Sequence, residues 1–345
     1  MKSLNKAGGL LAVVPTSEED LTAKLKSFVQ DKEAFSPNTW RQLLSVMRIC
    51  FRWSLDNGRS FLPMAPADMR DYLTHLHENG RASSTVSQHA SMISMLHRNA
   101  GLVPPNVSPE VSRSIKKINR VSVINGEKTG QAIPFKMVDL LTLDELWMRS
   151  PRIIEVRNLA FLHVAYSTLL RVSELARIRI RDLQRAADGR FILDVGYTKT
   201  IVDAGGLVKA LSSLSSQRLT EWIEVAGLAN EPDAYLFCRV HRVNRAIINT
   251  TSPLTTRALE TIYEDAWSIA GNDEPVVTNK GRYSGWTGHS ARVGAAQDMS
   301  AGGVHLTEIM REGTWRNVET VMRYLRNQDA HKGAMINLME KRSKS

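Results

Sequence analysis

Helix start and stop signals recur at short intervals in the early part of the chain. Apolar residues follow a helical period from residue 17 to about residue 121, and Ser-Pro and Asn-Gly pairs stand between the periodic segments. Proline suits the first turn of a helix because its fixed φ is already helical, whereas glycine commonly ends one. The starts fall at Ser36-Pro37, Pro66, Ser83-Ser84 and Ser108-Pro109, and the stops at Asn57-Gly58, Asn79-Gly80 and near Gly101. These signals predict a compact helical domain over residues 17–123.

Two of these helices have a clear apolar face. The residues predicted to face inward are Trp40, Leu43, Leu44 and Met47 in the helix that begins at Pro37, and Met92, Ile93 and Leu96 in the helix that begins near Ser83. The pair Ser83-Ser84 is predicted to cap the second of them.

The polar, glycine-bearing segment 124–134 interrupts the helical pattern and is predicted to be a linker. A length of 345 residues also favours two domains, because one core seldom serves so long a chain. Helices resume over residues 135–345, except that two β-type runs, 190–195 and 206–211, flank a turn and predict a small hairpin with Lys199 near its tip. The predicted fold class is therefore mainly α with two domains, preceded by a disordered tail over residues 1–16.

The charge balance of the chain favours a polyanionic partner. Lys and Arg outnumber Asp and Glu by 45 to 35, which gives a formal net charge of +10 and a pI near 9.7. Cys50 and Cys238 lie far apart without metal-ligand spacing, so reduced thiols are expected rather than a disulfide framework or a zinc site. No apolar run approaches the roughly 18 residues of a membrane span, and no membrane partner is expected.

Several common reaction types lack their motifs in this sequence. The chain contains no Gly-Lys dipeptide and therefore no Walker A phosphate loop, and it lacks HExxH and DxDxDG-type metal loops and the GxSxG elbow of hydrolases. An enzyme driven by ATP or by a metal ion is not indicated, and neither a cofactor nor a metal site is predicted.

The stretch 286–326 combines residues that suit a phosphate group. His289 and Arg292 stand three apart, and Tyr324 lies nine residues after Trp315. The planar fork of an arginine beside a Gly/Ser-rich helix start matches two phosphate oxygens. Taken singly, each arginine is more often part of a surface ion pair, and the tryptophan is more often part of the core.

Tyr324 can be placed on its predicted helix from the spacing alone. At about 100° per residue, Tyr324 lies about 110° from the centre of the apolar face. The residues that define this face are Val318, Val321, Met322 and Leu325. A position at the rim of the buried face suits a core-edge tyrosine as well as a nucleophile.

The combination of these residues is more specific than any one of them. Arg171 with Glu174, a lysine on a hairpin, a His-x-x-Arg pair, a tryptophan and then a tyrosine follow in this order in TLLRVSELARIRI, YTKTIVDAGG, WTGHSARVGAA and EIMREGTWRNVETVMRYLR. In these segments the chain resembles the tyrosine recombinase (phage integrase) family, and the resemblance extends from about residue 32 to residue 339.

This resemblance implies a site-specific DNA recombinase. Tyr324 would attack a backbone phosphate of DNA, form a 3′-phosphotyrosine and release a 5′-hydroxyl, and another strand would reverse the step through a Holliday junction without ATP or metal. Lys199 would act as the general acid on the leaving oxygen.

The other residues of the pattern would serve the phosphate. Arg171 and Arg292 would hold its two non-bridging oxygens, and Trp315 and His289 would donate further hydrogen bonds. His289 could also accept the tyrosine proton. Glu174 would orient the region of Arg171, with an ordinary charge near a helix start as an equal alternative.

The DNA contacts are expected from both domains. Arg257 lies opposite the apolar face of its predicted helix and at the N-terminal end, where a cation is unfavourable, so a base-edge contact in the major groove is favoured over simple exposure to solvent. By the resemblance, Gln42, Thr85 and Gln88 face the DNA groove from the first domain. Gln42 and Ser84 depart from the pattern that the chain resembles, and a target site shared with its relatives is therefore in doubt.

The resemblance also implies an assembly. Residues 333–339 (GAMINLM) would pack into a neighbouring subunit and form a homotetramer on two double-stranded DNA sites with inverted repeats, with packing inside the same subunit as the alternative. A cytoplasmic, nucleoid-associated protein of a bacterial cell, encoded by a phage, plasmid or other mobile element, is expected. Two other functions stay open: a DNA-binding regulator with a degenerate catalytic domain, and a topoisomerase-like or hairpin-forming relative.

Overall fold

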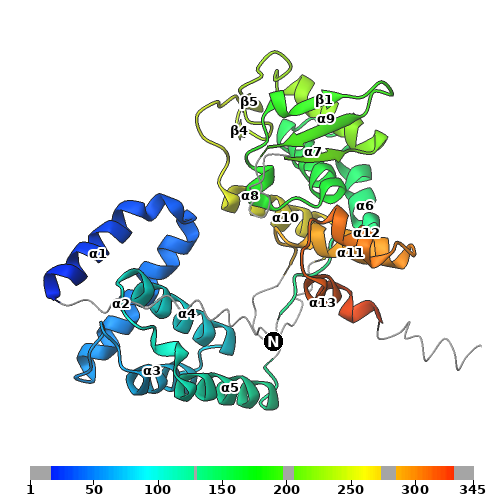
Figure 1. Cartoon of the computed structure of the whole chain (residues 1–345). Coiled ribbons are helices and arrows are strands. Elements are labelled where there is room, and N and C mark those ends of the chain that lie inside the picture. Colours follow the sequence, from blue (N-terminus) through cyan, green and yellow to red (C-terminus); the bar gives the residue numbers. More distant parts are fainter. Residues whose placement is uncertain (1–16, 128–129, 197–205, 273–284, 330–345) are drawn as a thin grey trace, which may run out of the picture. The chain divides into compact units, whose positions relative to one another are not determined.

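The computed structural model of the chain describes residues 17–127, 130–196, 206–272 and 285–329 (Figure 1). The chain divides into two compact units, an N-terminal unit over residues 1–129 and a C-terminal unit over residues 130–345. This division falls inside the segment 124–134 that the sequence suggests as a linker. The predicted tail, residues 1–16, lies outside the described residues. Within the described ranges, we find no helix with the length and apolar character needed to span a membrane.

The N-terminal unit is helical, as the start and stop signals predict. Its helices are α1 (Glu18–Gln30), α2 (Pro37–Asp56), α3 (Pro66–Glu78), α4 (Ser83–Asn99) and α5 (Pro109–Ile124). Proline stands in the first turn of α2, α3 and α5. Ser36 and Ser108 cap their helices, because their side-chain oxygens accept the backbone N–H groups of Thr39 and Glu110.

The start of α4 differs from the prediction. Ala82 is the N-cap residue, and a serine therefore does not cap this helix. The carboxylate of Glu127 takes that part, since it accepts the backbone N–H of Ser83 at 3.0 Å and the hydroxyl of Ser83 at 3.2 Å. A negative charge is favourable at a helix N-terminus. A partner 44 residues away leaves no local signature in the sequence.

The core of the N-terminal unit is formed by one stripe of each long helix. On α2 the buried stripe is Leu43, Val46, Cys50 and Trp53. The prediction that Leu44 faces inward is wrong, because Leu44 lies about 100° around the helix from Leu43 and is 48% exposed. On α4, Ile93 and Leu96 are buried as predicted, and Met92 is partly buried.

The C-terminal unit is built around α7 (Ile153–Thr168). Residues 157–166 are all buried, as expected for a helix that is covered on every side. It packs against α6 (Met137–Trp147), α9 (Ser213–Val225) and α11 (Ser290–Ala301). The described residues also form α8 (Val172–Leu175), α10 (Thr256–Ile269), α12 (Leu306–Glu312) and α13 (Val318–Asp329). Cys238 in this unit and Cys50 in the other are buried free thiols.

A three-stranded antiparallel sheet accompanies these helices (Figure 1). Its strands are β1 (Leu183–Arg185), β2 (Phe191–Val195) and β3 (Leu207–Ala210), in that order. The pairing of β2 with β3, in which Leu193 faces Lys209, confirms that the two predicted β-type runs pair. The sequence missed β1, β4 (Arg239–His241) and β5 (Arg245–Ile247), because three residues are too few to show an alternating pattern. Lys199 lies outside the described residues.

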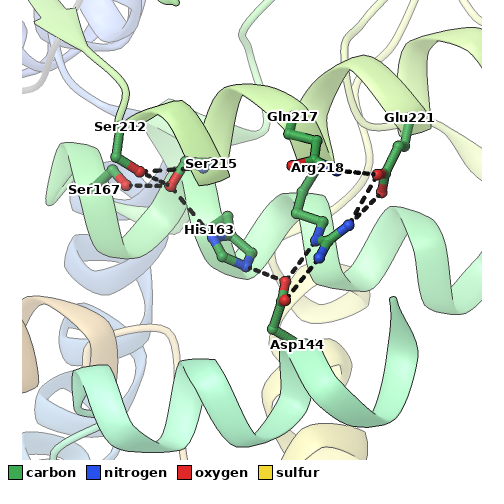
Figure 2. Close-up of polar contacts among 8 residues, drawn as sticks. All are labelled: Asp144, His163, Ser167, Ser212, Ser215, Gln217, Arg218 and Glu221. Atoms are coloured by element: carbon green, nitrogen blue, oxygen red, sulfur yellow. Dashed lines mark hydrogen bonds and ion pairs between the residues drawn. The ribbon is translucent and has the colours of Figure 1, made fainter. Parts of the chain in front are cut away.

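A buried polar network holds α6, α7 and α9 together (Figure 2). The carboxylate of Asp144 in α6 accepts hydrogen bonds from Arg218 in α9 at 2.6 and 2.8 Å. It also lies 2.9 Å from a ring nitrogen of His163 in α7, whose other ring nitrogen is 3.3 Å from the hydroxyl of Ser215. Burial works to raise the pKa of Asp144, but the hydrogen bonds and charge of Arg218 lower it overall. The carboxylate is therefore ionised and paired, and the three helices keep a fixed register.

Buried histidines make the stability of the N-terminal unit depend on pH. Nε2 of His97 accepts the backbone N–H of Met64 at 3.0 Å, and Nδ1 donates to the carbonyl of Ile93 at 2.8 Å. Burial lowers the pKa values of His97 and His89. Both rings are therefore neutral in the folded unit, whereas the unfolded chain takes up protons near pH 6.5. Because the unfolded state then binds more protons, the free energy of unfolding is expected to decrease as the pH falls from about 7.5 to about 5.5.

Hydrogen–deuterium exchange of peptides from α4 in the full-length protein measures this effect, once intrinsic exchange rates are corrected for pH. His97→Gln should reduce the pH dependence of protection, while His75→Gln, at an exposed position on α3, should leave it unchanged. Equal protection of α4 at about pH 7.5 and about pH 5.5 in the unmodified protein would contradict the assignment of neutral buried histidines.

Candidate active site

Arg171 is placed by an abrupt end of α7. Leu169, the C-cap residue, has a left-handed backbone with φ 54°, which is uncommon outside glycine, and α8 begins three residues later. Arg171 is the N-cap residue of α8. The carboxylate of Glu174 accepts the backbone N–H of Arg171 at 2.8 Å and its guanidinium at 2.9 Å. Glu174 is buried and Arg171 is partly exposed, so this contact is of the kind that the predicted orienting role of Glu174 requires.

His289 and Arg292 stand at the start of α11, and the residue before His289 lies against Val172, the first residue of α8. A Cβ added at Gly288 would come within 2.4 Å of Val172, so a side chain at this position would force the two helix starts apart. His289 is exposed to solvent, but partial desolvation of its ring, followed by the positive charges of Arg292 and Arg171, lowers its pKa. The imidazole is therefore neutral near pH 7, and one ring nitrogen is free to accept a proton.

Arg292 is the most enclosed of the described site residues, with 2% of its surface exposed. Its Nη1 donates to the carbonyl of Leu169, and its Nη2 donates to the carbonyl of Gly313 at 2.8 Å. Leu169 and Gly313 are the C-cap residues of α7 and α12. The guanidinium therefore binds the C-terminal ends of two helices, where a positive charge is favourable.

Arg292 keeps its positive charge although its side chain is buried. Desolvation lowers the pKa of Arg292 to about 10, and the repulsion from Arg171 adds to this, while interactions with Tyr324 and Glu174 oppose it. The group is still protonated near pH 7. Its Cζ lies 4.9 Å from the ring centre of Trp315, a distance at which a cation is attracted to an aromatic face.

Trp315 is folded back over the end of α12 by a tight turn. Thr314 has a left-handed backbone with φ 53°, and the backbone N–H of Trp315 donates to the carbonyl of Met310 at 2.9 Å. A Cβ at Gly313 would lie 2.1 to 2.3 Å from atoms of the indole ring, so the turn needs glycine there. The indole meets the ring of Tyr324 edge-on, with ring centroids 5.5 Å apart.

Tyr324 lies partly buried on α13, and two glutamine side chains hold its backbone. The carbonyl of Tyr324 accepts a hydrogen bond from Gln297 of α11 at 2.8 Å and another from Gln131 at 3.1 Å. These bonds connect the middle of α13 to α11 and to the segment that leads into α6. The position of the tyrosine hydroxyl therefore depends on α11, as does that of Arg292.

The buried face of α13 is narrower than predicted. Val321 and Leu325 are buried, but Val318 and Met322 are exposed, so the predicted face is wrong at these two positions. The helix packs against α11 and α12, and residues four apart suffice for that contact. Tyr324 lies at the rim, as its spacing predicts.

The structure brings together six of the seven residues that the sequence suggests for catalysis. They are Arg171, Glu174, His289, Arg292, Trp315 and Tyr324. The seventh, Lys199, lies outside the described residues. Three other residues that position the site were not predicted, namely Gly288, Gly313 and Gln297. Glycine beside a helix end is a recognisable sign of close packing, whereas nothing in the local sequence marks Gln297.

The candidate DNA contacts are distributed over both units. Arg257 lies in the first turn of α10 with 70% of its side chain exposed, and it pairs with Glu264 at 2.6 Å. An exposed ion pair of this kind contributes little to stability, so Arg257 can exchange Glu264 for another anion. Gln42 is exposed on α2, and Thr85 and Gln88 are partly buried on α4, which packs against α2.

Comparison with known protein sequences identifies one family and two relatives that this chain resembles. Residues 140–331 match the phage integrase family. The chain is similar to the Cre recombinase of Escherichia phage P1, with 42% identity over 329 residues that cover 95% of each protein. It is also similar to a XerD homolog, an integrase/recombinase of Selenomonas ruminantium, with 24% identity over 298 residues that cover 83% of this chain and 81% of the relative.

Solved structures share the fold. The Tn1549 transposon integrase in complex with circular intermediate DNA has a TM-score of 0.58 at 13% identity, covering 88% of this chain and 94% of that chain. A lambda integrase dimer bound to a COC′ core site has a TM-score of 0.53, also at 13% identity and with the same coverage. These similarities confirm the predicted fold class, mainly α with two domains. Because the family match spans more than half of the chain and the similarity to Cre extends along 95% of it, the chain belongs to the phage integrase family and is a Cre-like site-specific tyrosine recombinase.

Proposed function

We propose that Tyr324 is the nucleophile of this recombinase and that it attacks a backbone phosphate of DNA to form a 3′-phosphotyrosine. The observation that supports this most is that Cζ of Arg292 lies 4.9 Å from the ring centre of Trp315, whose indole in turn packs edge-on against the ring of Tyr324. The charge of Arg292 interacts with both Arg171 and Tyr324. A phosphodiester brought to this place would meet two cations next to one hydroxyl group.

Arg171 and Arg292 stabilise the transition state. A five-coordinate phosphorus carries an additional negative charge, and donors that are fixed before the reaction stabilise it without reorganisation. Arg292 uses two of its N–H groups on backbone carbonyls, and an arginine has five in all. The remaining donors can face a phosphate oxygen. Trp315 and His289 supply further hydrogen bonds.

Two protons have to move in the cleavage step. The neutral ring of His289 accepts the proton of Tyr324. The leaving 5′ oxygen needs a proton more urgently, because an alkoxide is far more basic than a phenolate, whose conjugate acid has a pKa of about 10. Lys199 donates that proton. Glu174 orients Arg171.

The covalent intermediate retains the energy of the broken bond. One phosphodiester becomes another, so the 5′-hydroxyl of a second strand can reverse the step without ATP. Two such exchanges pass through a Holliday junction. Arg257 reads a base edge in the major groove, and Gln42, Thr85 and Gln88 face the groove from the N-terminal unit. The target is a DNA site with inverted repeats, and the protein acts in the bacterial cytoplasm, at the nucleoid.

The active assembly is a homotetramer on two DNA sites. In it, residues 333–339 of one copy dock in an apolar cavity of about 470 Å³ in the C-terminal unit of the next. The cavity is lined in part by Met137, Leu140, Leu141, Met299 and Val304. The side chains of Met137 and Leu141 are exposed, and an apolar partner would cover them. The sequence GAMINLM has the matching apolar character.

Tyr324→Phe tests the nucleophile. The substrate is a duplex selected from a random-sequence pool by the unmodified protein and then nicked so that a covalent adduct accumulates. The variant should bind this duplex with unchanged affinity and form no adduct on a denaturing gel, because only the hydroxyl is lost. Adduct formation by the variant would refute the assignment. Cleavage without strand exchange by the unmodified protein would favour a topoisomerase-like activity instead.

Gly313→Ala tests the placement of Trp315. The new methyl group would displace the indole, and misplacement by about 1 Å can reduce a rate by about 10²-fold. Adduct formation should slow by about that factor with DNA affinity retained. Gly302→Ala is the matched control, because Gly302 has a negative φ and its Cβ would meet only carbonyl oxygens at 3.4 and 3.5 Å. Equal rates for the two variants would contradict the geometry.

A protein truncated after residue 329 tests the assembly. Without residues 330–345 it should cleave a single site at an unchanged rate but fail to pair two sites, as measured by analytical ultracentrifugation of the DNA complex. Undiminished pairing of two sites by the truncated protein would show that the subunits associate through another surface.

A further inference from the structure

Lys209 occupies an inward-facing position of β3 although it carries a charge. Leu207, Lys209 and Leu211 lie on the same face of the strand, and only 6% of the lysine side chain is exposed. Burying an ammonium group costs free energy unless the group is paired and hydrogen-bonded. The partners of Lys209 therefore indicate what it does.

Both partners belong to one residue at the end of α12. Nζ of Lys209 donates to the main-chain carbonyl of Glu312 and lies 3.1 Å from the carboxylate of the same residue. Glu312 is the last residue of α12, where carbonyl groups lack partners within the helix. Its carboxylate is 43% exposed. The main-chain contact is thus the more enclosed half of the interaction.

The next carbonyl along the chain belongs to the active site. Gly313 follows Glu312, and its carbonyl is the one that accepts Nη2 of Arg292. Two neighbouring carbonyls are therefore held by two cations, one from β3 and one from α11. Trp315 lies two residues after Gly313 and packs against Tyr324.

We infer that Lys209 is a positioning residue of the recombination reaction. It fixes the end of α12 and, through the turn at Gly313, the places of Trp315 and Tyr324. The inference rests on the catalytic roles proposed for these two residues. The contact between Lys209 and Glu312 also connects the strand pair to the part of the chain that carries Trp315 and Tyr324. The strand β3 follows the segment that carries Lys199. Lys209 acts on the turn and not on the phosphate.

Lys209→Met removes the charge and keeps a long unbranched side chain. In the full-length protein, DNA affinity for the selected duplex should stay unchanged, while the single-turnover rate of adduct formation should fall by about 10²-fold, as for a misplaced catalytic group. Lys209→Arg should recover most of the rate, because it restores a cation with several donors. Glu312→Gln should give a smaller decrease, and Glu308→Gln, at an exposed position of the same helix, should give none.

A 5′-phosphorothiolate substrate separates positioning from acid catalysis. Its thiolate leaving group needs no proton, so it should rescue Lys199→Ala but not Lys209→Met. Rescue of Lys209→Met would overturn the inference, since it would make Lys209 an acid. Unchanged rates of adduct formation in Lys209→Met and Glu312→Gln would also overturn it. So would a lower rate in Lys209→Met that is accompanied by lower DNA affinity and a lower melting temperature, because a general loss of structure would then explain the rate. If the unmodified protein forms no adduct, or if Tyr324→Phe still forms one, the assignment of Tyr324 as the nucleophile is wrong. That result is distinct from a failure of the role inferred for Lys209.

Discussion

The guanidinium of Arg292 is the group on which the proposed active site depends. It is buried, which is costly for a charge, and it is stabilised there by the carbonyls that end α7 and α12. Arg171 lies two residues beyond the first carbonyl and Trp315 two residues beyond the second. A single side chain thus sets the distance between two chain segments that are far apart in the sequence. The left-handed backbone of Leu169 and Thr314, beside these carbonyls, is strain that the contact helps to offset.

Small residues are the second condition for this geometry. α11 approaches the backbone of Phe135 so closely that a Cβ at Gly294 would lie 1.7 Å from the carbonyl oxygen of Phe135. The absence of a side chain at Gly288 likewise leaves room for Val172 of α8, and at Gly313 it leaves room for the indole of Trp315. Since α11 also holds the backbone of Tyr324 through Gln297, this helix relates the arginine, the histidine and the tyrosine to one another. The proposed reacting groups are therefore positioned by close backbone packing as well as by the side chain of Arg292.

Much of the fold could be predicted because its signals are local. The prolines at the starts of α2, α3 and α5 act on their own first turns, and the pairing of β2 with β3 follows from two β-type runs close together in sequence. Predictions failed where a partner lay elsewhere in the chain, and where packing covers only part of an apolar face. Glu127, and not a serine, caps α4, and Leu44 and Met322 are exposed because periodicity defines an apolar face more broadly than packing covers it.

The sequence by itself determined the helices, the strand pair, the reactive residue types and, through their order and spacing, the recombinase family. Only the tertiary structure decided how those residues are held. The carbonyl of Leu169 lies 123 residues from Arg292, and Lys209 lies 103 residues from Glu312. No periodicity relates such pairs. They meet because α7, α11, α12 and β3 pack in one core, and packing depends on the shapes of all the side chains between them.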